Sequence, residues 1–368
     1  MTAASRERPA PRVSVVVCTY NRCALLPDAL RGLLAQDAGG VPWELIVVDN
    51  NSRDATREVV HRLAGEGRGE VRYLFEGRQG LCHARNAGIA AARAPVVAFT
   101  DDDVRVAPDW VARIHGAFAA HPEVDFVGGR VLPRWPRPPP AWLTAEHWAP
   151  LAVVDLGDRP FRTSAARPVC LVGANLAFRR AVFARVGPFS PDFQHPAGGV
   201  CCTDDHEMEL RVWRSGGTGM YLPGLVVTAD VQADRLERGY HRRWHTGHGR
   251  MCARMRLAEA TAPDGSLHAP AAPHLALCGA PAFLYRDLLE EGARWAGATA
   301  LRRPAHAFMH ENRARHLAAY VAARYHEHRA AGARSLPAEA LRFTVALART
   351  KIGGFASRAL GAAWMNRG

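Results

Sequence analysis

The feature that most constrains this chain is the regular exchange of short β-branched runs and helical patterns between residues 13 and 128. Such alternation is typical of a parallel sheet built from βαβ units, so we predict a doubly wound α/β unit. The predicted strands are Val13–Cys18, Leu45–Asp49, Val71–Phe75 and Val96–Thr100. The predicted helices are Leu25–Leu34, one that follows the N-cap candidate Asp54, and one along the stripe of Leu81, Ala84, Gly88 and Ala92.

The sequence changes character after Gly129. The stretch RVLPRWPRPPPAWL is rich in proline, so we expect a long loop or lid and neither a helix nor a central strand. Regular structure should resume at Leu171, with helices at Ala181–Val186 and from Thr203 or Asp204, and strands at Met220–Leu222 and Leu225–Val227. From Leu236 the pattern is mainly helical, with breaks at Pro270, Pro273, Pro281, Pro304 and Pro337.

Composition narrows the class of protein. Of the 368 residues 48% are hydrophobic, which excludes a mainly disordered chain. No apolar run approaches the roughly 18 to 20 residues that cross a bilayer, and the start MTAASRERPAPR is polar, so we expect a cytoplasmic protein. The net charge of +12 favours anionic partners such as nucleotides, but there is no nucleic-acid module. The eight cysteines include no C-x-x-C pair, so we expect reduced thiols and no zinc cluster.

Three consecutive acids, Asp101, Asp102 and Asp103, follow the last predicted strand of the first half. Open α/β sheets bind ligands outside the carboxyl ends of their strands, so these acids fall where a site is expected. Carboxylates this close repel one another unless a cation such as Mg²⁺ or Mn²⁺ offsets their charge. The alternative is a solvated acidic turn ahead of a helix that begins near Pro108.

A second acidic group, Asp204 and Asp205, stands at the head of the helix predicted from Thr203. Acids at this position can simply stabilise the helix N-terminus. The functional interpretation is that one carboxylate faces a cleft as a general base.

Two neighbouring predicted strands end in polar residues, Thr19 to Arg22 and Asp49 to Ser52. Such ends can bind a base and a ribose by hydrogen bonds, although turn chemistry alone also explains them. The sequence contains neither G-x-G-x-x-G nor a P-loop, so dinucleotide and P-loop phosphate sites are not supported.

Taken together, the segments VSVVVCTYNR, WELIVVDNNSRD, GLCHARNAGI, VVAFTDDD, VGANLAFRRAVFARVGPF and TDDHEMELRVWRSGGTGMYLPG resemble family 2 glycosyltransferases of the GT-A fold, over roughly residues 12 to 250. The resemblance implies a Rossmann-like catalytic domain over residues 12–235, with a mostly parallel central sheet flanked by helices. Its nucleotide-binding half is expected at 12–128 and its acceptor half at 129–235. A flexible N-terminus at 1–11 and a mainly helical region at 236–368 complete the expected organisation.

The resemblance also implies roles for individual residues. Asp101 and Asp103 match the outer acids of the D-x-D motif, which holds Mn²⁺ or Mg²⁺, and Asp205 matches the catalytic base of inverting members. Asp204 stands in place of the longer acid that usually precedes this base. The residues expected to bind the nucleotide, with the base commonly uracil, are Thr19, Asn21, Arg22, Asp49, Arg85 and Asp102.

Some positions depart from the family pattern. Many relatives carry a histidine metal ligand where this chain has Asp230, which could substitute as an oxygen ligand. The segment from Tyr240 to Trp244 resembles the Q-x-x-R-W motif of processive synthases with tyrosine in place of glutamine. Because those enzymes also bring membrane helices, a single-addition transferase is favoured.

Further residues are expected near the acceptor or the diphosphate. These are Asn175, which the resemblance alone places there, and Asp204, Arg243, Trp244 and His248. The basic cluster of Arg242, Arg243, His245, His248 and Arg250 either neutralises a leaving diphosphate or forms an exposed helical face. Trp135 and Trp142 either stack on an acceptor sugar or anchor the lid.

The expected activity is metal-assisted, inverting transfer from a nucleoside-diphosphate sugar, with UDP favoured, to a hydroxyl. The acceptor stays open among a lipid-linked intermediate, a polysaccharide end, a protein and a small molecule. A nucleotidyltransferase acting on a sugar phosphate and a non-catalytic nucleotide-sugar-binding protein are the alternatives. The C-terminal helices either make peripheral contact with the inner face of a membrane, bind a partner helix, or pack on the catalytic domain.

Overall fold

The computed structural model describes residues 9–66, 70–194, 200–267 and 275–332. Structural statements below refer to these residues. Most of the N-terminal tail expected at residues 1–11, and the helix breaks expected at Pro270, Pro273 and Pro337, lie outside the described residues.

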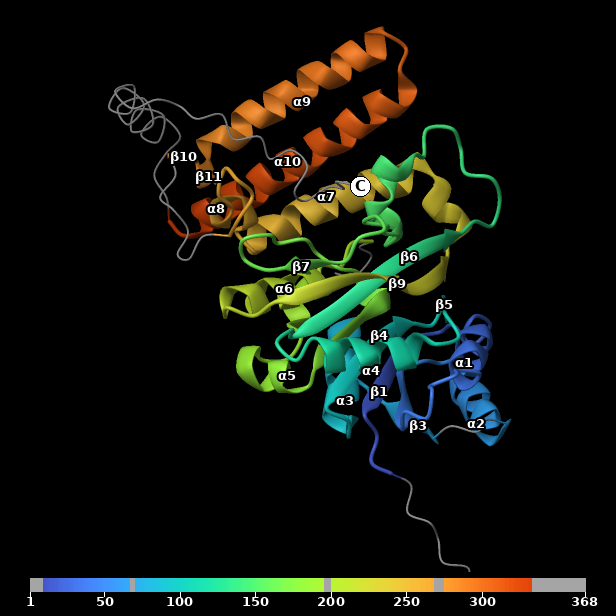
Figure 1. Cartoon of the computed structure of the whole chain (residues 1–368). Coiled ribbons are helices and arrows are strands. Elements are labelled where there is room, and N and C mark those ends of the chain that lie inside the picture. The colour runs from blue at the N-terminus through green and yellow to red at the C-terminus, as the bar shows by residue number, and fades with distance from the viewer. Residues whose placement is uncertain (1–8, 67–69, 195–199, 268–274, 333–368) are drawn as a thin grey trace, which may run out of the picture.

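The first half forms the predicted βαβ units (Figure 1). Its four strands lie parallel in the order β3-β2-β1-β4. Each strand and helix predicted in this half is confirmed, and wherever an end was predicted it lies within two residues of the observed end. The strands are β1 (Val13–Thr19), β2 (Trp43–Asp49), β3 (Glu70–Phe75) and β4 (Val96–Asp101). The helices are α1 (Leu26–Leu34), α2 (Thr56–Glu66) and α3 (Leu81–Ala91).

Both faces of this sheet are buried, which explains why its strands are apolar at nearly every position. Val15 of β1 points into a core that α1 and α2 cover, whereas Val16 points into the core on the opposite face, which includes residues of α3. Alternate residues of β2 and β4 divide between the same two cores. The sheet is therefore a central layer between two layers of helices, as predicted.

The second half extends this sheet. In the described residues the sheet has nine strands, ordered β3-β2-β1-β4-β8-β6-β9-β5, with β7 paired to β9. β6 and β9 run in the same direction as the first four strands, and β5, β7 and β8 run antiparallel, so the sheet is mostly parallel. The strands are β5 (Val104–Val106), β6 (Phe126–Arg134), β7 (Phe161–Thr163), β8 (Leu176–Arg179) and β9 (Gly219–Asp230); the helices are α4 (Trp110–Ala120), α5 (Ala181–Val186) and α6 (Asp204–Arg214).

The start of the proline-rich segment corrects one prediction. β6 continues through Pro133 to Arg134 and pairs with β9, where a loop or lid was expected. Proline is tolerated because β8 pairs only with Phe126–Gly128, so the other side of β6 is largely free of ladder partners at Pro133. Beyond Arg134 the segment follows irregular and short 3-10 structure, including Ala145–His147 and Ala149–Leu151.

β9 is one continuous strand, where two separate strands were predicted. Its register against β6 jumps between Gly129 and Arg130, which accommodates Pro223, Gly224 and Leu225 as a bulge. A Cβ atom at Gly129 would lie 1.9 Å from the carbonyl oxygen of Leu225, so the close approach at this bulge requires glycine.

Beyond β9 the described chain is mainly helical, as predicted. The elements are α7 (Arg238–Arg254), α8 (Leu257–Ala260), the hairpin β10 (Ala276–Leu277) and β11 (Ala280–Pro281), α9 (Ala282–Ala300) and α10 (Pro304–Ala330). Pro281 and Pro304 mark helix starts, where proline is favoured. Figure 1 shows α10 between α7 and α9 at the end of the molecule away from β1–β3. No described helix is both long and apolar enough to cross a membrane.

Candidate active site

The candidate site begins at the carboxyl ends of β1, β2 and β4. Thr19 of β1 pairs with Asp49 of β2, and Cys18 pairs with Asp101 of β4, so the three strands end at one edge of the sheet. The chain order reverses at β1, because β2 lies on one side of it and β4 on the other. Ligands of open α/β sheets bind at such switch points.

Arg22 links the loop after β1 to the acids after β4. Its Nη1 donates to Oδ1 of Asp102 at 2.8 Å and to Oδ2 of Asp103 at 2.9 Å. Asp103 also accepts a hydrogen bond of 3.2 Å from Nε2 of Gln232. The sequence analysis missed Gln232, which follows the last strand of the sheet by two residues and carries no motif of its own.

The acids after β4 are partly desolvated. Burial raises the pKa of Asp101 to about 7, with Arg85 opposing the shift and the neighbouring charges of Asp103 and Asp102 adding to it. Burial also raises the pKa of Asp102, and the charge of Arg22 opposes that rise. The alternative of a freely solvated acidic turn does not fit this burial.

Arg85 and Asp204 form a buried ion pair. Nη1 of Arg85 in α3 donates to Oδ2 of Asp204, and both side chains are at most 6% exposed. The guanidinium also lies over the rings of Phe189 and Phe99, with its Cζ 5.3 and 5.7 Å from the ring centroids. Arg85 is therefore part of the interior, which corrects the expectation that it contacts the diphosphate or base.

Asp205 lies beside this pair and is only half-buried. Its Oδ2 accepts from the backbone N–H of Gly173 at 3.0 Å, and its Oδ1 accepts from that of His206 at 2.8 Å. Burial and then the charge of Asp204 raise the pKa of Asp205, while Arg85 opposes the rise. The field of Arg85 thus acts on Asp101 and on Asp205, which places the two acidic clusters around one buried cation.

The loops after β1 and β2 hold each other. Oδ1 of Asn21 accepts from the N–H of Arg53 at 2.8 Å, and the N–H of Asn21 donates to the hydroxyl of Ser52 at 2.9 Å. Asn21 and Asn51 both adopt positive φ, at 51° and 65°, a conformation that asparagine tolerates in turns. Asn21 therefore has a clear structural role besides the predicted one.

Asp49 and Thr19 are buried at the predicted nucleotide edge. Oδ1 of Asp49 accepts from the N–H of Ser52 at 2.8 Å, and Oδ2 accepts from the hydroxyl of Tyr73 at 2.7 Å. Both carboxylate oxygens thus have partners within the chain. Tyr73 was also missed, because its position inside a strand gave no sign that its hydroxyl reaches this edge.

Asn175, expected near the acceptor, has partners within the protein. Asn175 is fully buried: its Oδ1 accepts from the indole of Trp110 at 2.8 Å, and its Nδ2 donates to the carbonyls of Arg130 and Leu225, both at 2.9 Å. The side chain of Asn175 thus has a structural role in the interior, and its expected position near the acceptor side of the cleft stays a prediction.

Asp230 is held at the end of β9. Both of its carboxylate oxygens accept from the guanidinium of Arg134, and its backbone N–H donates to the carbonyl of Asp103 at 2.9 Å. Both carboxylate oxygens of Asp230 are thus engaged by Arg134, which argues against the expected third metal ligand. The hydrogen bonds from Arg22 and Gln232 to Asp103 instead both go to Oδ2.

The basic residues of α7 do not form one surface. Arg242 pairs with Glu311 of α10 at 2.7 Å and His245 is buried, whereas Arg243 and Arg250 are exposed. The cluster therefore fits neither of the two alternatives, a group around a leaving diphosphate or one exposed helical face, as a whole.

Trp244 and His248 lie on the side of α7 that meets α10. The ring of Trp244 stacks on that of His248 at a centroid distance of 4.5 Å, and Nδ1 of His248 lies 3.2 Å from Nδ1 of His316 in α10. The contacts described for these two residues are within α7 and with α10, so their expected position near the acceptor or diphosphate stays a prediction.

The tryptophans of the proline-rich segment act as anchors. Trp135 and Trp142 pack against a small core formed by Leu143, Leu151, Val153, Val231 and Leu236. Trp142 also meets the rings of Phe308 and His241 at 4.8 and 5.0 Å. The structure therefore supports the interpretation that these tryptophans anchor the segment rather than stack on an acceptor sugar.

The arrangement of sheet, switch point and paired acidic clusters is that of the GT-A class of nucleotide-sugar enzymes. The sequence model of the family "Glycosyl transferase family 2" matches residues 14–187. Residues 14–187 thus match this family, as the resemblance of the sequence motifs predicted.

Curated relatives agree with this assignment. The chain is 31% identical over 182 residues to a glucosyl-dolichyl phosphate glucuronosyltransferase of Haloferax volcanii, covering 48% of this chain and 56% of that protein. It is 32% identical over 227 residues to a validoxylamine A glucosyltransferase of Streptomyces hygroscopicus subsp. jinggangensis, covering 56% of this chain and 52% of that protein. The chain thus spans about half the length of these relatives.

A solved structure extends the similarity to the fold. The mannosyltransferase of Pyrobaculum calidifontis, solved in complex with GDP-Man and Mn²⁺, is 25% identical with a TM-score of 0.51. The match covers 92% of this chain and 80% of that one. The predicted GT-A fold with a helical C-terminal region is confirmed.

Proposed function

We propose that this protein transfers a sugar from a nucleoside-diphosphate sugar to an acceptor hydroxyl, with inversion at the anomeric carbon. The observation that carries the proposal is the position of Arg85. It pairs with Asp204, the neighbour of Asp205 in α6, and its Cζ lies 5.7 Å from the ring of Phe99, two residues before Asp101 at the end of β4. Displacement at the anomeric carbon in one step requires that the acid that binds the donor and the base that activates the acceptor lie close to each other. The family match and a structural neighbour solved with GDP-Man support the same activity.

Asp205 is the proposed general base. Two backbone N–H groups, those of Gly173 and His206, hold its carboxylate at 3.0 and 2.8 Å and so fix its direction. Burial raises its pKa, which makes its anion a stronger proton acceptor than an exposed aspartate. As the acceptor oxygen attacks C1, its proton passes to Asp205, and the bond from C1 to the diphosphate oxygen breaks on the opposite face.

The acids after β4 fit a divalent cation. Asp101 and Asp103 offer hard oxygen donors, and the raised pKa of Asp101 reflects a buried carboxyl whose charge is incompletely offset. We propose that these two residues hold Mn²⁺ or Mg²⁺ and that Asp230 does not. When bound, such an ion offsets the negative charge of the departing diphosphate.

The remaining residues of the edge are proposed to bind the nucleotide. Thr19 and Asp49 lie at the ends of adjacent strands, and Arg22 carries a positive charge beside the acids after β4. Our sequence-based expectation favours UDP, whereas the Pyrobaculum neighbour holds GDP-Man, so both bases enter the test below.

The acceptor class is proposed from the names of two relatives. One is a glucosyl-dolichyl phosphate glucuronosyltransferase and the other a validoxylamine A glucosyltransferase. A lipid-linked sugar and a small hydroxylated molecule are therefore the two acceptor classes to assay.

A donor panel tests the activity. The full chain is incubated with UDP-, GDP- and dTDP-sugars, with Mn²⁺ or Mg²⁺ and with both acceptor classes. Release of free nucleoside diphosphate together with a glycosylated product of inverted anomeric configuration, measured by NMR, is the expected result. Pyrophosphate release from a sugar phosphate and a nucleoside triphosphate would establish nucleotidyl transfer instead. Tight donor binding without transfer to either acceptor class would favour the non-catalytic alternative.

A further inference from the structure

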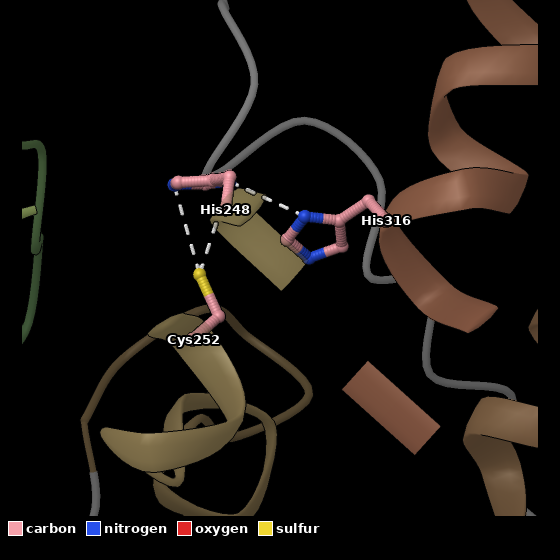
Figure 2. A group of neighbouring side chains, drawn as sticks. All are labelled: His248, Cys252 and His316. Carbon is pink, nitrogen blue, oxygen red and sulfur yellow. Dashed lines mark hydrogen bonds between the residues drawn. The ribbon is translucent and has the colours of Figure 1, made fainter. Parts of the chain in front are cut away.

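A cluster of three metal-ligating side chains lies between α7 and α10, apart from the acids of the candidate active site. Figure 2 shows His248 and Cys252 from α7 facing His316 from α10. One ligand atom from each residue lies within 4.8 Å of those of the other two. In the described residues no further group of three or more histidine, cysteine or carboxylate side chains meets this condition.

The separations within the cluster are close to those of a coordinated ion. Nδ1 of His248 lies 3.2 Å from Nδ1 of His316, and Sγ of Cys252 lies 3.6 Å from Nε2 and 3.9 Å from Nδ1 of His248. Tetrahedral Zn²⁺ with ordinary bond lengths places two nitrogen ligands about 3.3 Å apart and a nitrogen and a sulfur about 3.6 Å apart. Nδ1 of His248 is the nitrogen that faces both partners, at 3.2 Å from His316 and 3.9 Å from Cys252, and all three ligand atoms lie within 4.8 Å of one another. Binding one ion would therefore draw Cys252 and the two rings closer together by a modest movement.

The helices hold these residues together for identifiable reasons. His248 and Cys252 are four positions apart on one helix, so they project from the same face. His316 reaches them because α7 and α10 almost touch at Gly249, where a Cβ atom would lie 2.1 Å from the carbonyl oxygen of His316. The ring of Trp244 stacks on His248 and limits its rotation.

A second contact fixes the register of the two helices. The guanidinium of Arg242 donates to both carboxylate oxygens of Glu311, at 2.7 and 3.0 Å. Arg242 precedes His248 in α7, and Glu311 precedes His316 in α10, by about one and a half helical turns in each case. Because this ion pair already aligns the two helices, the three ligands meet in a preformed interface.

We propose that His248, Cys252 and His316 form a zinc site that fastens α10, the last of the described helices, to α7. Imidazole and thiolate are soft or borderline ligands that suit Zn²⁺, whereas Mg²⁺ and Mn²⁺ prefer the carboxylate oxygens of the candidate active site. Three protein ligands leave one position of a tetrahedral ion for water. The expectation of no zinc cluster rested on the absence of a C-x-x-C pair. His248 and Cys252 are spaced as H-x-x-x-C, but the third ligand, His316, comes from another helix, which the sequence pattern does not place beside them.

The site is independent of the proposed transfer reaction. Its ligands come from the helical region that follows β9, and none of them is Asp101, Asp103 or Asp205. A bound ion would stabilise the folded chain, since it binds the assembled interface and has no comparable site when α7 and α10 are apart.

Zinc binding by the untagged full chain tests this proposal. The protein is stripped with chelator, titrated with Zn²⁺, Mn²⁺ or Mg²⁺, and its metal content and thermal unfolding are measured. We expect one equivalent of Zn²⁺ bound at this cluster and a rise in Tm with Zn²⁺. Replacing Zn²⁺ by Co²⁺ should give a thiolate-to-cobalt charge-transfer band, which reports a cysteine ligand; the variants below assign that ligand to Cys252.

Matched variants assign the ligands. Cys252→Ala and His316→Ala should weaken Zn²⁺ binding by more than the roughly 100-fold that loss of an outer-sphere partner can cost, and should abolish the Co²⁺ band. Cys278→Ala removes another buried thiol and should keep both signals. Because the cobalt spectrum is recorded on the unaltered chain, it remains decisive if a variant fails to fold. Absence of the band, or equal zinc affinity in all variants, would overturn the proposal and leave the cluster as a hydrogen-bonded contact.

Discussion

Arg85 in α3 and Asp204 in α6 form an ion pair that joins residues 119 positions apart, with both side chains almost fully buried. The pair fixes where α6 begins relative to the sheet. Since Asp205 follows Asp204 directly, the position of the proposed base depends on an arginine of α3 in the first half of the fold.

Arg85→Met should strongly destabilise the fold. Removing one partner of a buried pair leaves an unpaired charge and typically costs about 3 to 5 kcal/mol. Urea unfolding measures the change, and Arg78→Met is the matched control, because Arg78 pairs with Glu76 at the surface and its loss should change the free energy of unfolding little. If the two variants unfold at the same urea concentration, the pair does not hold α6.

Asp205→Asn should abolish transfer and leave donor binding intact. The amide preserves size but cannot accept the proton, so we expect kcat to fall by at least about 100-fold. Initial rates and donor titration by calorimetry measure the two effects separately. Glu207→Gln, in the same first turn but paired with Arg211, should retain turnover. Full turnover of Asp205→Asn would exclude it as the base.

The raised pKa of Asp205 predicts a pH dependence of turnover. A base acts only when it is deprotonated. As the pH is lowered, kcat at saturating substrates and metal should therefore begin to fall at a pH above about 3.9, the pKa of an ordinary aspartate. The contribution of this carboxyl to folding has the opposite trend: it is complete at pH below the unfolded pKa and is lost as the pH rises through the raised one. Turnover that stays constant down to pH 4 in a folded enzyme would contradict the assignment.

The first half of the fold was predictable because its information is local. Apolar strands such as Val13–Thr19 and polar residues at their carboxyl ends follow from sequence, and the rule for parallel sheets then brings Thr19 and Asp101 to one edge. Side-chain partners across long separations were not predictable in this way. The local pattern around Arg85 says nothing of Asp204, which decides that this arginine is buried.

The same limit explains the other corrections. The proline-rich pattern predicted a loop, but whether Pro133 can lie in a strand depends on which side of β6 has a partner, which is a tertiary property. Asp230 has the chemistry of a metal ligand, yet Arg134 of the neighbouring strand neutralises it.

Removal of divalent cations should abolish transfer, and Mn²⁺ or Mg²⁺ should restore it. Asp103→Asn removes one charge from the proposed metal site, so we expect the metal concentration for half-maximal rate to rise by at least about 10-fold. Asp109→Asn is the control, since this exposed acid of the same segment pairs with Arg113. Equal metal dependence of both variants would show that Asp103 does not hold the ion.

The interior position of Asn175 yields a prediction that separates a structural role from an acceptor-binding one. Its side chain joins Trp110 of α4 to backbone carbonyls of β6 and β9, and each buried polar group left without a partner costs about 1 to 3 kcal/mol. Asn175→Ala should therefore lower the free energy of unfolding by about 3 kcal/mol or more, measured by urea denaturation. The folded fraction should keep the KM for acceptor of the unaltered enzyme. A variant of unchanged stability with a raised acceptor KM would support the role that the sequence suggested, because an acceptor-facing amide would contact substrate and not the core.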